Sequence, residues 1–206
     1  MNGLVLKDLL TLRSSIAFIF LLTVVFAIVF SWNSPGSVIL VSAVMMTSII
    51  NGSFSMDHSY GWNAHAVSIG IPRSTIVRSK FGFGAMFVAA GIIFGIILAL
   101  VFKMVIGYQT TIDVMVPSVM VALGISLISA AVICAVNYHV SPNKAQVVSI
   151  LCTSISVAGS VIAGNLLGEL TDGIPYSASV IMMVFGIVLF ALMYIESQRR
   201  FAHSDL

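Results

Sequence analysis

Long apolar blocks separated by short polar segments dominate the chain. Blocks without Asp, Glu, Lys, Arg or His cover residues 16–32, 37–54, 81–102, 114–136, 145–167 and 176–195. Each block is close to the roughly 20 residues that an α-helix needs to cross the hydrocarbon core of a bilayer. Turn-forming residues separate several of them, at 33–36, 141–143 and 172–175. The pattern predicts an all-α, polytopic membrane protein with six transmembrane helices.

The composition strengthens this prediction. Of the 206 residues, 59% are hydrophobic and 8% are charged, whereas soluble domains carry roughly 25% charged residues. Six spans use about 120 residues, so the ends and loops leave no room for a separate soluble domain. We expect a single transmembrane domain over residues 1–206. Cys134 and Cys152 lie inside apolar blocks, where free cysteine behaves as a small hydrophobic residue.

The positive charges predict the orientation, because cytoplasmic loops keep an excess of lysine and arginine. With the N-terminus inside, only Lys103 lies in an outer segment. The inner segments contain Lys7, Arg13, Arg73, Arg78, Lys80, Lys144, Arg199 and Arg200. Both termini and the segments 55–80 and 137–144 are therefore expected in the cytoplasm. Residues 1–15 favour either a helix lying in the inner membrane interface or a cytoplasmic extension of the first span.

The spans lack several features that other membrane proteins need. No ionisable residue lies at the centre of a span, which argues against an ion-coupled carrier and against an intramembrane protease or transferase. The chain has no Gly-x-x-x-x-Gly-Lys-Ser/Thr phosphate loop, so energy for uphill transport would have to come from another subunit. The four histidines are scattered, with no cysteine or carboxylate cluster beside them, and no metal site is predicted.

Small and weakly polar residues recur within the spans. Gly91 and Gly95 form a Gly-x-x-x-Gly pair, and small residues recur along the fifth span. Such residues let helix backbones approach closely, either inside one bundle, at a dimer seam or along a translocation path. Polar side chains in lipid need partners or a wet cavity, so the second and fifth spans are candidates for lining a path. The candidate path residues are Thr47, Asn51, Ser149, Ser156 and Ser160.

The polar segment 55–80 combines several local signals. Residues 60–68 favour a short helix that carries Trp62, with Gly61 allowing a sharp entry. Trp62 is either an interfacial anchor or a side chain that fits a pocket on a partner. Pro72 interrupts the helix, and Ser74 is expected to cap the next one. Lys80 and its neighbouring arginines are expected at the inner headgroups, where they fix the topology.

At the residue level this segment and the N-terminus resemble a known family. The N-terminal pattern Leu-x-Leu-Lys-Asp-Leu-Leu occupies residues 4–10. The segment 55–80 has the form Asp, then Gly-Trp, then Pro-Arg, then Ile-Val-x-Ser-Lys, carried by Asp57, Gly61, Trp62, Pro72, Arg73, Ile76, Val77, Ser79 and Lys80. Together they resemble permease subunits of type-2 ABC transporters. The nearest group is the small bacterial permeases of phenol-soluble modulin exporters and of bacteriocin export or immunity systems.

The resemblance implies a division of labour between subunits. The short helix around Trp62 would be a coupling helix that docks into a separate ATPase subunit, with residues 137–144 as a smaller contact. The implied partner-binding residues are Asp57, Tyr60, Gly61, Trp62, His65, Pro72 and Arg73. The chain itself would need no cofactor and would not be an enzyme, because ATP and Mg would bind to the partner. A second copy or a sister permease, and membrane lipid, would complete the complex in a bacterial cell membrane; nucleic acid is not an expected partner.

Three functions remain open at this point. The leading hypothesis is an exporter permease that moves a hydrophobic or amphipathic substrate by alternating access, because the spans contain Ser, Thr and Asn but no charge. A peptide is the first candidate, and lipid-like molecules or drugs fit the same lining. The second is a non-transporting immunity or sensor module that binds a partner through segment 55–80. The third is a passive oligomeric pore.

Overall fold

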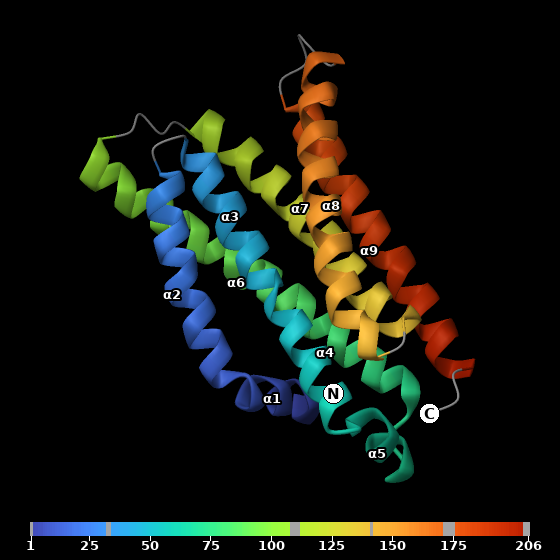
Figure 1. The fold of residues 1–206 in the computed structure, drawn as a ribbon. Coiled ribbons are helices and arrows are strands. Elements are labelled where there is room, and N and C mark those ends of the chain that lie inside the picture. Colours follow the sequence, from blue (N-terminus) through green and yellow to red (C-terminus); the bar gives the residue numbers. More distant parts are fainter. Residues whose placement is uncertain (1, 32–33, 108–111, 141, 171–175, 204–206) are drawn as a thin grey trace.

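The computed structural model describes residues 2–31, 34–107, 112–140, 142–170 and 176–203, and all the regular elements in these segments are helices. The helices are α1 (Asn2–Thr11), α2 (Arg13–Phe30), α3 (Pro35–Thr47), α4 (Ile49–Ser59), α5 (Trp62–Ser68), α6 (Arg73–Ile106), α7 (Ile112–His139), α8 (Pro142–Leu170) and α9 (Ser177–His203). The long helices run up and down in sequence order, as predicted for an all-α membrane protein (Figure 1).

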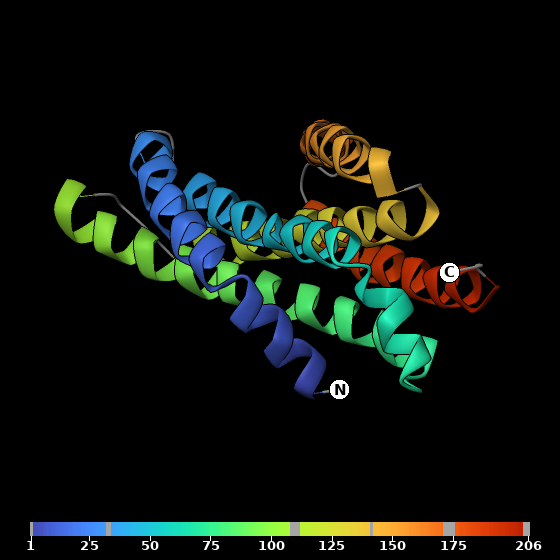
Figure 2. The same ribbon diagram turned by 60° about the horizontal axis from the view of Figure 1, so that its bottom comes forward.

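Both chain ends lie at the same end of the bundle as the short helix α5 (Figures 1 and 2). We call this the α5 end. Helix α2 leads away from it, α3 and α4 return to it, and α6, α7, α8 and α9 then alternate in direction. The shared position of α1, α5 and the end of α9 agrees with the predicted placement of both termini and segment 55–80 on one side of the membrane.

Five segments of the described chain are long and apolar enough to cross a membrane. They are Arg13–Phe30, Pro35–Ser59, Arg73–Val105, Ile112–His139 and Ser177–Ala202. Helix α8 contains a shorter apolar stretch, Val147–Gly159. These segments correspond to the predicted spans, and α8 occupies the place of the fifth. The described chain is thus a multi-pass membrane protein.

Glycine residues allow two pairs of helices to pack at very short distances. A Cβ atom added to Gly95 of α6 would lie 2.8 Å from the Cα of Ile39 in α3, and one added to Gly91 would lie 2.9 Å from the Cα of Ala43. Helices α7 and α9 cross in the same way, because a Cβ on Gly124 would lie 2.5 Å from a backbone oxygen of α9. The predicted Gly-x-x-x-Gly contact is therefore packing inside one bundle.

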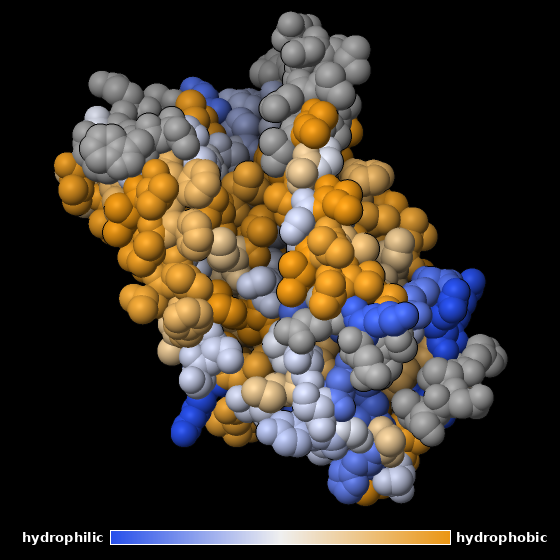
Figure 3. Space-filling model, viewed as in Figure 1, coloured by the Kyte–Doolittle hydropathy of each residue, from blue (hydrophilic) through white to orange (hydrophobic). Residues whose placement is uncertain are grey.

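The outer surface of the bundle is apolar along most of its length. Figure 3 shows hydrophobic side chains over α2 and over the middle part of α8, and hydrophilic ones gathered at the α5 end. Exposed apolar side chains occur on α2, α6, α8 and α9, as expected where helices face lipid rather than water.

Local structure at the α5 end differs from the expectation in two places. The second span does not end near residue 54, because α4 continues as a helix to Ser59. The prediction that Ser74 caps the following helix is wrong: Pro72 occupies the N-cap position, and α6 begins at Arg73. Proline has a fixed φ that suits a helix start, and no side chain caps the first turn of α6. Helix α1 is separate from α2, with a break at Leu12, and runs across the foot of the bundle (Figure 1).

Candidate functional site: an ion ring beside helix α5

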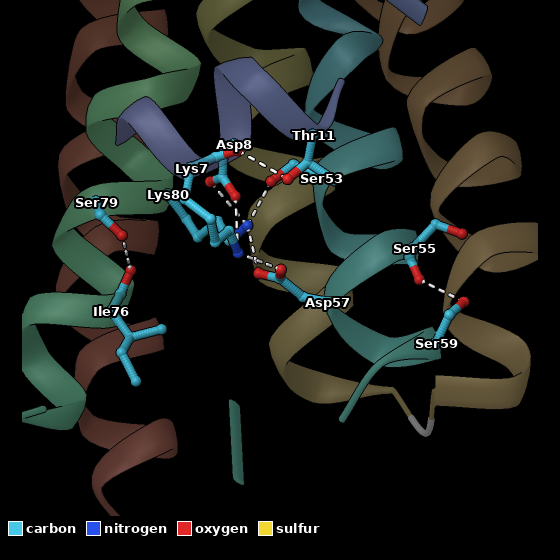
Figure 4. Close-up of polar contacts among 10 residues, drawn as sticks. All are labelled: Lys7, Asp8, Thr11, Ser53, Ser55, Asp57, Ser59, Ile76, Ser79 and Lys80. Carbon is cyan, nitrogen blue, oxygen red and sulfur yellow. Dashed lines mark hydrogen bonds and ion pairs between the residues drawn. The ribbon is translucent and has the colours of Figure 1, made fainter. Parts of the chain in front are cut away.

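Four charged side chains form a closed ring at the α5 end. Lys7 and Asp8 come from α1, Asp57 from the last turns of α4, and Lys80 from α6. Each lysine is paired with both carboxylates: Lys7 Nζ lies 3.0 Å from Asp8 Oδ1 and 2.5 Å from Asp57 Oδ1, and Lys80 Nζ lies 2.9 Å from Asp8 Oδ2 and 2.5 Å from Asp57 Oδ2 (Figure 4). We call this arrangement the ion ring. It connects three helices that are distant in the sequence.

The ion ring is largely shielded from solvent. The exposed fraction is 3% for the side chains of Lys80 and Asp8, 4% for Asp57 and 25% for Lys7. Removing charges from water is costly unless each has a partner of opposite sign. Two cations alternate with two anions, so the ring is neutral and no member is left without a counter-charge. Lys80 also donates a hydrogen bond to the hydroxyl of Ser53 in α4.

Aromatic rings cover both lysines. The Nζ of Lys7 lies 4.5 Å from the ring centroid of Trp62, and the Nζ of Lys80 lies 5.3 Å from that of Phe54. Both distances are within the range of a favourable cation–π interaction. Because Trp62 is the first residue of α5, its contact with Lys7 ties the short helix to α1 and to the ion ring.

Two glycines with left-handed backbone conformations flank helix α5. Gly61 precedes it with φ +60°, and Gly70 follows it with φ +89°. At the C-terminal end, the N–H of Ile71 donates to Ala66 O and the N–H of Gly70 donates to Val67 O, each at 3.0 Å. This is a Schellman cap, in which glycine is favoured because it has no Cβ. The predicted short helix after Gly61 is confirmed.

The end of α9 is joined to the start of α6. Arg73 donates hydrogen bonds to the backbone oxygens of Phe201 and Ala202, at 3.0 and 3.2 Å. The ring of Phe201 packs 5.2 Å from that of Tyr138, which in turn lies 5.3 Å from that of Phe54. Arginine at the C-terminal end of a helix satisfies carbonyl groups that have no partner within the helix. The C-terminal helix is thus anchored to the same assembly as α5.

The structure divides the predicted partner-binding residues into exposed residues and residues that contact other parts of the chain. Tyr60 is 77% exposed at the tip of the α4–α5 turn, and Gly61, His65 and Pro72 are also exposed. Asp57 is buried in the ion ring, while Trp62 and Arg73 are half-buried and bound to other parts of the chain. The four exposed residues are available to a partner, and Asp57, Trp62 and Arg73 fix the position of the segment that carries them.

The expectation for Lys80 is wrong, and two members of the ion ring were missed. Lys80 does not reach toward the headgroups, because its ammonium group is buried between two carboxylates. Lys7 was predicted only as one of the inner positive charges, and Lys7 and Asp8 only as part of the N-terminal pattern at residues 4–10. A usable signal was present: two cations and two anions stand at the membrane-proximal ends of three helices on the same predicted side.

Two of the candidate path residues are brought together. The Ser149 hydroxyl of α8 donates a hydrogen bond of 2.7 Å to Asn51 Oδ1 of α4. Thr47 is fully buried, and its hydroxyl donates to Ala43 O within its own helix. Ser156 and Ser160 lie on α8, but their side chains are outside the described residues. The pairing of Asn51 with Ser149 shows that the second and fifth predicted spans are neighbours.

The fold and this site define a class of protein. It is a multi-pass helical membrane protein in which a short helix protrudes from one end of the bundle and is held there beside buried ion pairs. Residues 3–202 match the model of the family described as ABC-2 family transporter protein, and the chain belongs to this family. Members are generally non-catalytic membrane components that work as a dimer with a separate ATPase subunit. No curated protein and no solved structure matches the chain.

Proposed function

We propose that this chain is the permease subunit of an ATP-driven exporter in a bacterial cell membrane. Two copies, or this chain and a sister permease, pair with ATPase subunits that bind ATP and Mg. The complex moves a hydrophobic or amphipathic substrate, a peptide in the first instance, by alternating access. The α5 end faces the cytoplasm, in agreement with the lysine and arginine residues gathered there.

The observation that carries the proposal is the way α5 is mounted. The helix projects between the ends of α4 and α6, and Asp57 of α4 pairs with Lys80 of α6 directly behind it. Trp62 binds α5 to Lys7 of α1. A force applied to α5 by a partner therefore acts on α1, α4 and α6 together, because breaking a buried ion pair is costly. Such a mount suits a helix that transmits the motion of an ATPase.

The exposed tip of this mount supplies the docking surface. Tyr60 is 77% exposed and Ile69 is 59% exposed, and they stand at the two ends of α5. Tyrosine is common among interface residues that contribute most of the binding energy. Trp62 is a positioning residue in this scheme, because its ring faces Lys7 rather than open solvent. In this scheme the main contacts of the ATPase subunit are with Tyr60, His65 and Ile69.

The distribution of charge supports a hydrophobic cargo. The buried charges of the described chain, Asp8, Asp57 and Lys80, all belong to the ion ring at the α5 end. Farther from that end, the buried polar side chains of the described helices are uncharged, including Ser42, Thr47 and Ser126. An ionic cargo would need compensating charges within the membrane, whereas an amphipathic peptide needs apolar walls with occasional hydrogen-bonding groups.

Affinity purification from native membranes tests the proposal. A tagged chain in mild detergent is expected to retain an ATP-binding subunit in a fixed ratio, identified by mass spectrometry. The double variant Tyr60→Ala/Ile69→Ser is expected to weaken this association about 30-fold, because removal of a well-buried interface side chain costs about 2 kcal/mol.

A matched control lies at the opposite end of the molecule. Met104 of α6 is 87% exposed and lies far from α5 along a helix of 34 residues. Met104→Ala should leave ATPase association unchanged. Wild-type protein that carries no ATP-binding subunit contradicts the transporter proposal and favours a sensor or immunity module. Retained binding in the Tyr60/Ile69 variant contradicts the assigned docking surface.

A further inference from the structure

Helix α1 has its charged side chains turned inward and its leucines turned outward. Lys7 and Asp8 contact the ion-ring residues of α4 and α6. Leu6 is 55% exposed and Leu10 is 63% exposed, and residues four apart lie on the same face of a helix. A surface helix of a soluble protein has the reverse arrangement, with its polar face outward. The outward face of α1 is thus suited to an apolar environment.

The remaining apolar side chains of α1 and its end hold the helix against the bundle. Val5 and Leu9 pack against the buried core, and Leu12, at the break between α1 and α2, is itself buried. Together with the ion ring, these contacts fix the rotation of α1 about its own axis. The outward position of Leu6 and Leu10 is therefore set by the fold.

The length of α2 places α1 at the level of a membrane surface. Helix α2 has 18 residues and is about 27 Å long, close to the roughly 30 Å of the hydrocarbon core. Because α2 needs its whole length to cross, its first residue, Arg13, stands at the membrane boundary. Helix α1 directly precedes this boundary and runs across the foot of the bundle (Figure 1). It therefore lies where the lipid headgroups meet the acyl chains.

The surroundings of the leucine face favour lipid as its partner. Helix α2, to which α1 is joined, is one of the segments long and apolar enough to cross a membrane, and its Phe18 and Leu21 are 60% and 63% exposed. Arg13 is exposed at the junction of the two helices, where its guanidinium group is placed to reach headgroup phosphates. An apolar face beside a lipid-facing helix, with a cation at the boundary, matches the chemistry of a membrane surface.

We propose that α1 is held on two sides: the ion ring binds its charged side to the bundle, and lipid of the leaflet at the α5 end binds Leu6 and Leu10. This lipid contact goes beyond the proposed function, because it requires neither an ATPase subunit nor a cargo. It also has a consequence for α5. Lys7 Nζ lies 4.5 Å from the ring centroid of Trp62, so a helix α1 fixed in the membrane surface also fixes the height of α5 relative to that surface.

Quenching by brominated lipid tests the contact directly. Leu10→Cys is introduced together with Cys134→Ala and Cys152→Ala, and the single thiol of the full chain is labelled with a fluorescent dye. The labelled protein, with any subunits that it retains, is reconstituted in vesicles of phosphatidylcholine and phosphatidylglycerol. Bromine atoms on the upper part of the acyl chains should reduce the emission to about half, because the apolar face of an interfacial helix lies about 5–10 Å into the boundary between headgroups and acyl chains.

Tyr60→Cys in the same background is the matched control. Tyr60 is 77% exposed at the tip of the α4–α5 turn, so the chain covers it no more than it covers Leu10. Its dye should keep its emission in brominated vesicles and be quenched by iodide in the water. Leu6→Cys, one turn from Leu10 on the same face, should show the same lipid quenching as Leu10→Cys and replaces that variant where it fails to fold.

Hydrogen exchange tests the consequence for α5. The variant Leu6→Gln/Leu10→Gln weakens the hold of lipid on α1 and leaves the ion-ring residues in place. In vesicles, amide exchange should become about threefold faster in α1 and in α5, and it should stay unchanged in α9. Thr11→Gln, at an exposed polar position of the same helix, should leave the exchange of all three helices unchanged.

The outcomes separate the lipid contact from the proposed function. Emission at Leu10→Cys that brominated lipid leaves unchanged overturns the lipid contact. Quenching by iodide at that position would then show that α1 faces water, and protection from both quenchers would show that another subunit covers it. Unchanged exchange in α5 overturns its coupling to the membrane surface. None of these results depends on whether an ATPase subunit is bound, which affinity purification decides.

Discussion

Replacing Asp57 with asparagine removes one charge from the ion ring while keeping the shape of the side chain. Lys7 and Lys80 are then left to share Asp8, and the buried cluster acquires a net positive charge. Removing one partner of a buried ion pair costs about 3–5 kcal/mol. Lys80 keeps its contact with Asp8 at 2.9 Å, and Lys7 is 25% exposed to solvent. We therefore expect a loss near the lower value, about 3 kcal/mol.

This loss is large enough to measure by thermal unfolding. For a chain of this size each kcal/mol shifts Tm by about 2–4 °C, so Asp57→Asn should lower Tm by roughly 10 °C. Cys134 is fully buried and becomes reactive when the bundle opens, so a thiol-reactive fluorescent dye reports unfolding in detergent. Unfolding at the wild-type temperature would refute the stabilising role of the ring.

A second substitution distinguishes ring chemistry from general damage. Adding Lys7→Gln to Asp57→Asn restores neutrality and leaves the pair of Asp8 with Lys80, so about half of the lost Tm should return. Arg13→Gln is the matched control, because Arg13 is exposed and makes no contact with the ion ring. Equal recovery with both substitutions would show that total charge, and not the geometry of the ring, sets the stability.

Three further perturbations test other parts of the fold. Gly95→Leu should sharply reduce folded protein on immunoblots of membranes, because a Cβ there lies 2.8 Å from Ile39 Cα, whereas Gly82→Leu, with open space around it, should not; equal levels would contradict the close crossing. Gly61→Ala forces a side chain into a backbone with φ +60° and should cost about 1 kcal/mol, seen as a Tm lower by about 2–4 °C. Arg73→Leu removes donors to the last carbonyls of α9, so amide hydrogen exchange should accelerate at the end of α9 and stay unchanged in α7.

The sequence predicted the helical spans because hydropathy is a local property. The apolar block 114–136 lies within α7, and the block 81–102 lies within α6. The end of the second span was missed, because Asp57 and His58 were interpreted as loop residues. Backbone hydrogen bonds continue the helix to Ser59, and the burial that lets a charged residue stand there comes from helices elsewhere in the chain.

The sequence shows the four charges of the ion ring on one predicted side, but it does not give their pairing, for a geometric reason. Lys7 and Asp8 are adjacent on α1, and adjacent residues on a helix point about 100° apart. The contact of Lys7 with Asp57 and that of Asp8 with Lys80 depend on α1 lying across the foot of the bundle, which no local pattern specifies. In contrast, Trp62 and Gly61 were recognised, because a tryptophan after a turn glycine is visible in one short segment. The proposed docking surface includes Tyr60 and His65 of the predicted partner-binding set but not Trp62, because only the structure shows that Trp62 faces Lys7.

The ion ring also places a condition on biosynthesis. Its members stand at positions 7, 8, 57 and 80, so it closes only after Lys80, near the start of α6, has left the ribosome. Until then, Asp8 and Asp57 have only Lys7 of the ring between them, and a buried carboxylate without its own counter-charge is costly. Lys80 supplies the second counter-charge. The same contacts that hold α5 in the finished protein therefore form only in a chain that has been synthesised as far as α6.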